Sequence, residues 1–192
     1  LDGGGVQTEK CHYLHGKRDG ECSYFFANGS PQQIAHYKNG KPTGVHKSYY
    51  PTGIPASVTP HNEYGVRHGE VIRWWQTGAL QSKATYVNGK IIGKQQSFYA
   101  DGKQQAVTVY VDGKLHGDRL SWWPDGSKQA EGKYQDGKPV GKHLRWYQDG
   151  TKQSEITYVD GKQHGTSTWW WQTGELQTER TYDMGVAHGE HK

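Results

Sequence analysis

Histidine is the residue type in this chain that most suggests chemistry, because it is a common metal ligand and there are 11 of them. Four recur just before a glycine: His68, His116, His164 and His188. The closest two are 24 residues apart, which in a sheet of hairpins separates them by about 10 Å. One Zn²⁺ needs its ligands about 2.1 Å away. We therefore expect these side chains to make local hydrogen bonds. The tail His188-Gly189-Glu190-His191 is only a weak metal motif.

The order of the other polar residues predicts no catalytic centre. The chain has no Gly-x-Ser-x-Gly elbow, no Walker A loop and no Gly-x-Gly-x-x-Gly loop. Most aspartates precede a glycine, where turn formation explains them. No pair of carboxylates stands out as a glycosidase couple. We therefore predict a protein that is not an enzyme and has no cofactor and no metal.

The two cysteines, Cys11 and Cys22, flank one short turn segment near the start of the chain. The corresponding positions elsewhere in the chain hold no Cys. Two cysteines that face each other across a terminal hairpin can cross-link its two strands. We therefore expect a Cys11–Cys22 disulfide and an oxidising compartment. The alternative is two separate thiols in a cytosolic protein.

The elements that position these residues follow a repeat, whose first glycine recurs every 24 residues with a single step of 25. A second glycine follows four residues after it, and a third nine residues later, so that the three series include most of the 27 glycines. The first glycines are Gly16, Gly40, Gly65, Gly89, Gly113, Gly137, Gly161 and Gly185. We place the extra residue of the long step between Gly53 and Gly65, as a bulge or a slack loop near Pro55 and Pro60.

Aromatic residues keep the same register, with a pair five and six residues after the second glycine and a Tyr three residues before the first. The exception is Asn62, in the unit with the extra residue. Asn-Gly and Asp-Gly pairs between the short apolar segments are strong hairpin signals, because these residues accept positive φ. Only an antiparallel meander fits this alternation. We predict an all-β, elongated array of about eight hairpin units over residues 10–192, preceded by a tail over residues 1–9.

The unit Tyr-x-(Asn/Asp)-Gly-Lys-x-x-Gly, followed by the aromatic pair and a third glycine, resembles a MORN repeat. It is most similar to the bacterial variant found in antitoxin-like and immunity-like proteins. The unit lacks the Gly-x-Gly step of eukaryotic MORN repeats, which disfavours phosphoinositide binding. The resemblance implies a hairpin-repeat fold and a role as a scaffold, a protein-binding ribbon or a toxin-neutralising protein.

Alternate positions after the second glycine define two faces of the sheet. The odd face contains aliphatic and aromatic residues such as Leu120 and Trp122, and we expect it to be the core, together with the Tyr series. The even face mixes rings with arginines, which are residue types enriched at interfaces. We predict that it binds a partner through Arg73, Trp75, Tyr99, Arg119, Trp123, Arg145, Tyr147, Trp169 and Trp171. The alternative is a second packing layer on that face.

Charge and hydropathy exclude two classes of partner or location. The formal net charge is +4, and the basic residues are dispersed rather than clustered, so nucleic-acid binding is not expected. No apolar run reaches the roughly 20 residues that span a bilayer, although association with a membrane surface stays open. No signal peptide is visible, and the chain starts at Leu1 without Met, as a trimmed or mature form would.

Taken with the resemblance, these observations predict an immunity or antitoxin protein that neutralises a cognate toxin. The expected disulfide favours the bacterial periplasm, with the cytoplasm as the alternative. Toxins that act in the periplasm attack lipids or the cell wall, so the expected partner is a lipase or a cell-wall hydrolase. Carbohydrate or cell-wall binding and scaffolding at a lipid surface are the alternative functions.

Overall fold

The computed structural model describes residues 8–188, and every regular element within them is a β-strand. The chain divides into two compact units, with the boundary inside β8 (Lys90–Phe98); residues 100–102 belong to unit 1 and residues 93–99 to unit 2. Unit 1 contains β1 (Glu9–Leu14), β2 (Lys17–Phe25), β3 (Pro31–Lys38), β4 (Lys41–Tyr49), β5 (Pro55–His61), β6 (Gly69–Trp74) and β7 (Leu80–Val87). Unit 2 contains β9 (Gln104–Val111), β10 (Lys114–Trp122), β11 (Lys128–Gln135), β12 (Lys138–Trp146), β13 (Lys152–Val159), β14 (Lys162–Gln163), β15 (Gly165–Trp170), β16 (Leu176–Asp183) and β17 (Val186–His188).

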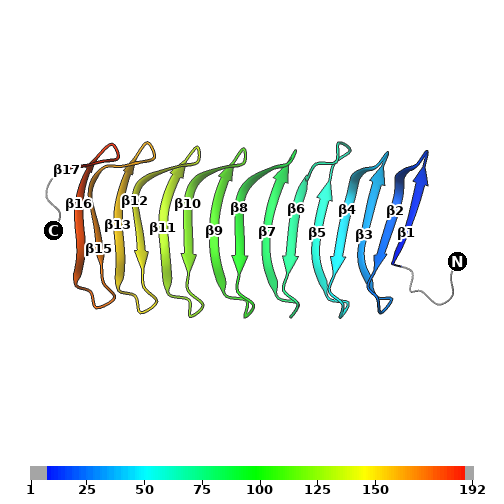
Figure 1. Cartoon of the computed structure of the whole chain (residues 1–192), viewed down its shortest axis with the longest axis horizontal. Helices are drawn as coiled ribbons and strands as arrows, with labels where there is room; N and C mark the ends of the chain where they lie inside the picture. Colours follow the sequence, from blue (N-terminus) through cyan, green and yellow to red (C-terminus); the bar gives the residue numbers. More distant parts are fainter. Residues whose placement is uncertain (1–7, 189–192) are drawn as a thin grey trace. The chain divides into compact units, whose positions relative to one another are not determined.

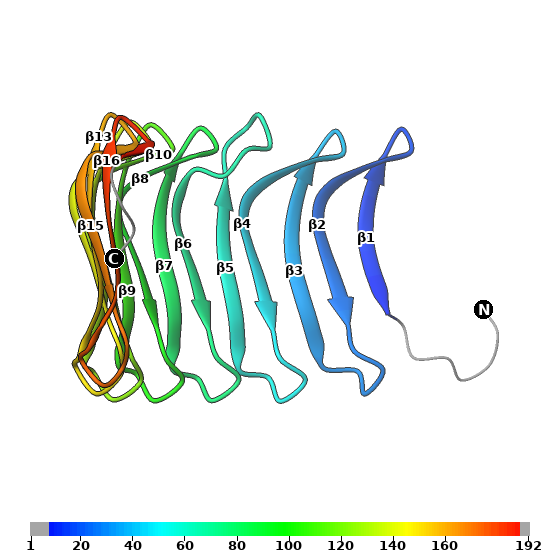
Figure 2. The same cartoon turned by 60° about the vertical axis from the view of Figure 1, so that its left-hand side comes forward.

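Within each unit, successive strands pair antiparallel in chain order, and β14 and β15 both pair with β13 (Figure 1). Figure 2 shows the strands of unit 1 side by side, from β1 in blue to β7 in green. The structure confirms the predicted all-β meander of hairpin repeats. Residues 1–7, and Gly189 and His191 of the C-terminal motif, lie outside the described part of the chain, while β1 already begins at Glu9.

The hairpin turns form where the Asn-Gly and Asp-Gly pairs predict them. Asn39 has φ 51° and Gly40 has φ 80°, so both central residues are left-handed, as a two-residue turn of this type requires. The other non-glycine residues with positive φ are His15, Asn88, Asp112, Asp136, Asp160 and Met184. Each precedes the first glycine of its repeat, which shows that the same turn also forms with His or Met in the first central position.

The extra residue of the long repeat lies between Gly53 and Gly65, as predicted, but in the hairpin turn that follows His61 and not in a bulge near Pro55 and Pro60. β5 runs without interruption from Pro55 to His61, and His61 pairs with Gly44 as Tyr37 pairs with Gly20. The turn that follows is closed by a bridge between His61 and Arg67. Asn62 stabilises this turn, because its Oδ1 accepts hydrogen bonds from the backbone N–H groups of Tyr64 and Val66.

The most buried side chains lie on the even face, which corrects the expected position of the core. Arg119 of β10 pairs with Gly132 of β11, and Gly117 pairs with Tyr134, so the Tyr series and its small neighbours share the even face. The buried side chains are Cys22, Ala35, His46, Val71, Ala84, Ser154 and Ser167, all on the even face.

The odd face contains half-buried rings that lysine side chains cover. Lys128 Nζ lies 5.4 Å from the ring centroid of Trp146, and Lys152 Nζ lies 5.3 Å from that of Trp170. Lys152 is also held by Glu155, at 2.8 Å. A single sheet layer has no second layer to exclude water, so both faces depend on side chains of the same layer for burial.

Aromatic side chains at the sixth position after the second glycine connect adjacent repeats. The Tyr99 hydroxyl donates to the carbonyl oxygen of Trp122 at 2.7 Å, and Tyr147 donates to Trp170 at 3.0 Å. Tyr50 donates in the same way to Trp74 at 2.8 Å, and Trp123 Nε1 donates to Trp146 at 3.2 Å. We call these contacts the inter-repeat hydrogen bonds. They satisfy a carbonyl at the end of the next repeat's strand.

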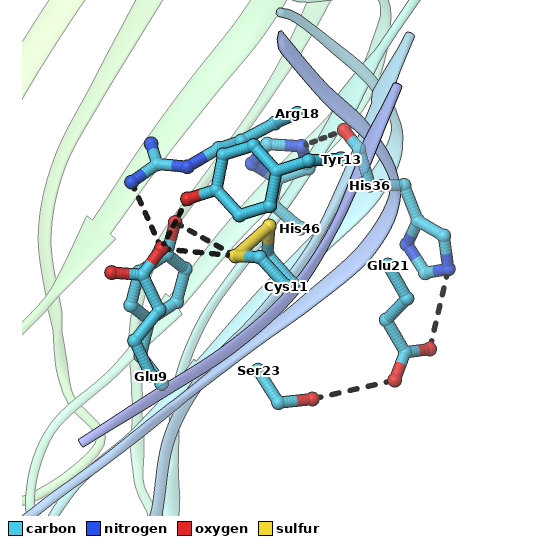
Figure 3. The surroundings of a disulfide bond; sticks show 10 residues. Glu9, Cys11, Tyr13, Arg18, Glu21, Ser23, His36 and His46 are labelled. Carbon is cyan, nitrogen blue, oxygen red and sulfur yellow. Dashed lines mark hydrogen bonds and ion pairs between the residues drawn. A yellow bond between two sulfur atoms is a disulfide. The ribbon is translucent and has the colours of Figure 1, made fainter. Parts of the chain in front are cut away.

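The first hairpin is closed by the Cys11–Cys22 disulfide that the sequence predicts (Figure 3). Cys11 of β1 lies directly opposite Cys22 of β2, with their Cα atoms 4.1 Å apart, and Cys22 is fully buried. Beside the disulfide, Glu9 accepts hydrogen bonds from Tyr13 and from Arg18, at 3.2 Å and 3.1 Å. The disulfide therefore fixes the pairing of the terminal strand.

Candidate binding groove

A groove of about 640 Å³ lies on the even face of unit 2. Its lining comes from β10, β11, β12, β13, β15 and β16 and from the residues that follow β10 and β12, so it runs across the strands. Small residues on β11 form part of the lining: Ala130, beside Arg145, and Gly132, beside Arg119. The alternation of large and small cross-strand partners leaves this space open.

Two arginines line the groove, and neither has an acidic partner. The guanidinium groups of Arg119 and Arg145 are exposed and make no ion pair or hydrogen bond within residues 8–188. The acidic residue of the lining, Glu131, is bound by Lys128 at 2.7 Å. Lys142 is likewise bound by Glu155, also at 2.7 Å. The groove therefore carries net positive charge that other residues of the fold leave uncompensated.

A stacked row of rings holds His143 in the lining of the groove. Its ring lies between those of Tyr134 and Tyr158, with centroids 5.1 Å and 4.8 Å away, and Nε2 donates to the carbonyl oxygen of Lys133 at 2.9 Å. Burial lowers the pKa of His143, and Arg145 shifts it in the same direction. The imidazole is therefore neutral at neutral pH.

Gly132 is required by the close approach of His143. A Cβ atom on Gly132 would contact the His143 ring at 2.4 Å from Nδ1, closer than real Cβ contacts. Gly132 has no positive φ, so the constraint is space rather than backbone conformation. In unit 1 the same position is Ala35, and the centroid of the His46 ring lies 5.4 Å from that of Tyr37. The same repeat position therefore holds Gly beside His143 in unit 2 and Ala in unit 1.

A row of glutamines contributes free amides to the groove, and the sequence analysis did not single it out. Gln129, Gln153 and Gln177 each occupy the extra position of a β-bulge, one repeat apart. Their side-chain amides make no hydrogen bond within the part of the chain that the structure describes. The sequence does contain a signal for this row, because Gln81 and Gln105 precede the three glutamines at the same 24-residue spacing.

The groove brings together five of the nine residues that the sequence assigned to partner binding: Arg119, Trp123, Arg145, Tyr147 and Trp169. Arg73 and Trp75 belong to unit 1 and do not line the groove. Tyr99 forms an inter-repeat hydrogen bond, and Trp171 is 51% exposed. Partner binding by these nine residues stays a prediction. The geometry shows in addition that Trp123 and Tyr147 hold repeats together, a role that the sequence analysis did not foresee.

The row of turn histidines makes local contacts, as expected. His164 Nδ1 lies 3.2 Å from Asp183 of the next turn, and His68 Nδ1 lies 3.3 Å from Asn88. Among the described residues, one group could hold a metal: Glu9 with Cys11 and Cys22. Both sulfur atoms of that group are joined to each other, so they are not available as thiolate ligands.

Comparison with known families supports the repeat assignment. Four segments, residues 18–39, 67–88, 139–160 and 163–184, match the family described as MORN repeat variant. The first two lie in unit 1 and the last two in unit 2. MORN repeats are in general protein- or lipid-binding modules rather than catalytic ones. No curated protein matches the chain. The described residues contain no helix long and apolar enough to span a membrane.

Proposed function

We propose that this chain is a non-enzymatic, protein-binding repeat protein whose partner binds in the groove of unit 2. The observation that carries the proposal is the pair of unpaired guanidinium groups of Arg119 and Arg145 beside half-buried rings. Arginine, tryptophan and tyrosine are the residue types that most often contribute the largest share of protein–protein affinity. The five predicted residues that share the groove contribute the partner contacts in this proposal, together with Tyr99 and Trp171 of unit 2. Arg73 and Trp75 belong to unit 1 and are not part of the groove.

The partner in this proposal is a bacterial toxin, and the chain is the immunity protein that neutralises it. The similarity to the MORN repeat variant and the absence of a predicted catalytic centre support a binding role. The Cys11–Cys22 disulfide supports an oxidising compartment, for which the bacterial periplasm is our proposal. A lipase or a cell-wall hydrolase has its substrate in that compartment, and covering the mouth of its active site would inhibit it.

The test begins with the gene that neighbours the one encoding this chain. Its product is directed to the periplasm of a bacterial host, alone or together with this chain. We expect the product to arrest growth alone, the wild-type chain to restore growth, and a double variant, Arg119→Gln with Arg145→Gln, to restore it less. If the neighbouring product is harmless, or the wild-type chain does not restore growth, the immunity proposal is wrong.

Carbohydrate binding is the second candidate, because the groove also presents free glutamine amides next to aromatic rings. Amides and ring faces can bind the hydroxyl groups and the apolar faces of sugars. Sedimentation with purified peptidoglycan distinguishes the two functions. Retention that is lost in Trp169→Ala would favour a cell-wall-binding module over a toxin-binding protein.

A further inference from the structure

The spacing of the groove's repeated side chains matches the pitch of one particular ligand conformation. Equivalent residues in adjacent repeats are two strands apart, which is about 9.6 Å. One turn of a polyproline II helix takes three residues and advances about 9.3 Å. A β-strand presents one face every two residues, or about 6.7 Å, and an α-helical turn advances about 5.4 Å, so neither stays in step with the repeats.

The glutamine row provides the hydrogen bonds that such a ligand requires. Gln129, Gln153 and Gln177 are identical residues at successive steps of the groove, with unpaired side-chain amides. A polyproline II segment has no internal hydrogen bonds, so its backbone carbonyl groups need external donors when it leaves water. A glutamine amide is both a donor and an acceptor and can bind one ligand peptide group per turn.

The charge of the lining determines which polyproline II segment fits. Arg119 and Arg145 have no acidic partner within residues 8–188, and Glu131 is already bound by Lys128. The two arginines come from β10 and β12, on either side of β11, and so from two successive repeats. They are displaced by two residues along the strands, since Arg119 pairs with Gly132 and Arg145 with Ala130, and their long side chains span this displacement. A ligand with carboxylates on successive turns would place one beside each guanidinium group, where charge-assisted hydrogen bonds form.

We infer that the groove of unit 2 binds an acidic, proline-rich segment of a partner protein in the polyproline II conformation, with every third residue facing the groove. The inference rests on the proposed function, since it names the part of the partner that the groove recognises. Aromatic rings favour such ligands, because a preformed polyproline II helix loses little conformational entropy when it docks between them. In the groove these rings are Trp123, Tyr147 and Trp169.

The probe is a fluorescently labelled peptide of repeated Glu-Pro-Pro triplets, about twelve residues long, and binding is measured by fluorescence anisotropy at low salt. Three control peptides separate the causes. Gln-Pro-Pro triplets remove the charge, Glu-Gly-Gly triplets remove the preformed helix, and a scrambled Glu-Pro-Pro peptide removes the period. We expect the Glu-Pro-Pro peptide to bind at least about tenfold more tightly than each control.

Variants then locate the binding. Arg119→Gln and Arg145→Gln should each weaken binding by about three- to tenfold, and Gln153→Ala should weaken it as well. The matched controls lie in unit 1: Arg73 occupies the repeat position of Arg145, and Gln81 that of Gln153. Arg73→Gln and Gln81→Ala should leave the affinity unchanged.

Four outcomes would overturn the inference. Equal binding of the ordered and scrambled peptides would show that charge alone attracts them, without the match in period. Equal losses in the variants of both units would place binding outside the groove. Vesicles of anionic phospholipid that bind more tightly than every peptide, with loss in Arg145→Gln, would identify a lipid surface as the ligand. The fourth outcome is that the peptide does not bind, while the double arginine variant still restores growth less than the wild type in the toxin experiment. This inference would then be wrong, and the proposed function would still be supported.

Discussion

The inter-repeat hydrogen bonds give a stability prediction that separates a structural role of the ring from its role in binding. Tyr147→Phe removes only the hydroxyl that donates to the carbonyl oxygen of Trp170 at 3.0 Å, and the ring remains in place. A hydrogen bond of this kind contributes about 0.5–1.5 kcal/mol, and a carbonyl group left without a partner raises the cost toward the upper end. We expect the free energy of unfolding to fall by about 1 kcal/mol.

Tyr99→Phe removes the equivalent bond to Trp122 and should cost the same. The two bonds share no partner, so the double variant should lose about 2 kcal/mol. For a chain of this length each kcal/mol corresponds to a decrease of about 2–4 °C in the melting temperature. The denaturant dependence should not change, because the surface buried on folding is the same in each variant.

Urea denaturation followed by circular dichroism measures these differences. Tyr64→Phe is the control, because Tyr64 lies in the turn with the extra residue and is 71% exposed. Its removal of a hydroxyl should leave the free energy of unfolding within about 0.5 kcal/mol of the wild type. If Tyr147→Phe and Tyr64→Phe have the same stability, the hydroxyl bonds contribute nothing and the reasoning is refuted.

Three other predictions follow from single contacts. Non-reducing peptide mapping of protein from an oxidising compartment should find Cys11 linked to Cys22, and a double Cys→Ala variant should be less stable by about 2–3 kcal/mol; two alkylated thiols would contradict this. Trp123→Ala should lower the melting temperature as Trp122→Ala does, because Trp123 binds the next repeat; a fully stable Trp123→Ala would show that the indole hydrogen bond is dispensable. The pKa of His143 is lowered in the folded state, so its contribution to stability is complete above about pH 6.5 and is lost as the pH falls below that value. Urea melts between pH 7 and pH 5 should show a smaller loss in His143→Gln than in the wild type, and equal losses would exclude this role.

The fold was predictable because its signals are local and repeated. Each Asn-Gly or Asp-Gly pair determines a two-residue turn through positive φ, as Asn39 and Gly40 show. A turn so short leaves one register for the flanking strands, and the meander follows. The Cys11–Cys22 pair was predictable because both residues flank the same short turn, and a register shift between Cys11 and Tyr13 brings them directly opposite each other.

The face that forms the core was not predictable from residue type alone. Alternation shows which residues share a face, but it assigned the large Trp122 and Leu120 to the interior. The most buried positions are instead small residues of the even face, such as Ala35 and Ser167, which are fully buried. The cross-strand register decides which residues of neighbouring strands share a face. It places Tyr134 opposite Gly117, on the even face and not on the face of Trp122.

The groove was predictable only in part. Arg119, Arg145 and Trp169 were found because their residue types are those of interfaces. The glutamines were missed, because Gln153 and its equivalents are unremarkable as single residues and matter only through their place in a β-bulge. That place becomes visible when the pairing of Arg145 with Ser154 is followed by that of Trp146 with Lys152, leaving one residue unpaired.

The inter-repeat hydrogen bonds also bear on how such an array can change length during evolution. Each bond joins a repeat only to the one that follows, as Tyr147 joins its own repeat to Trp170. The energy of each unit then resembles that of a one-dimensional lattice with coupling between nearest neighbours. Duplicating a 24-residue segment adds one more identical coupling and disturbs no distant contact. Gain or loss of a whole repeat should therefore be tolerated, whereas an insertion inside a strand, unlike the one in the turn beside Tyr64, would shift the register of the strand that contains it.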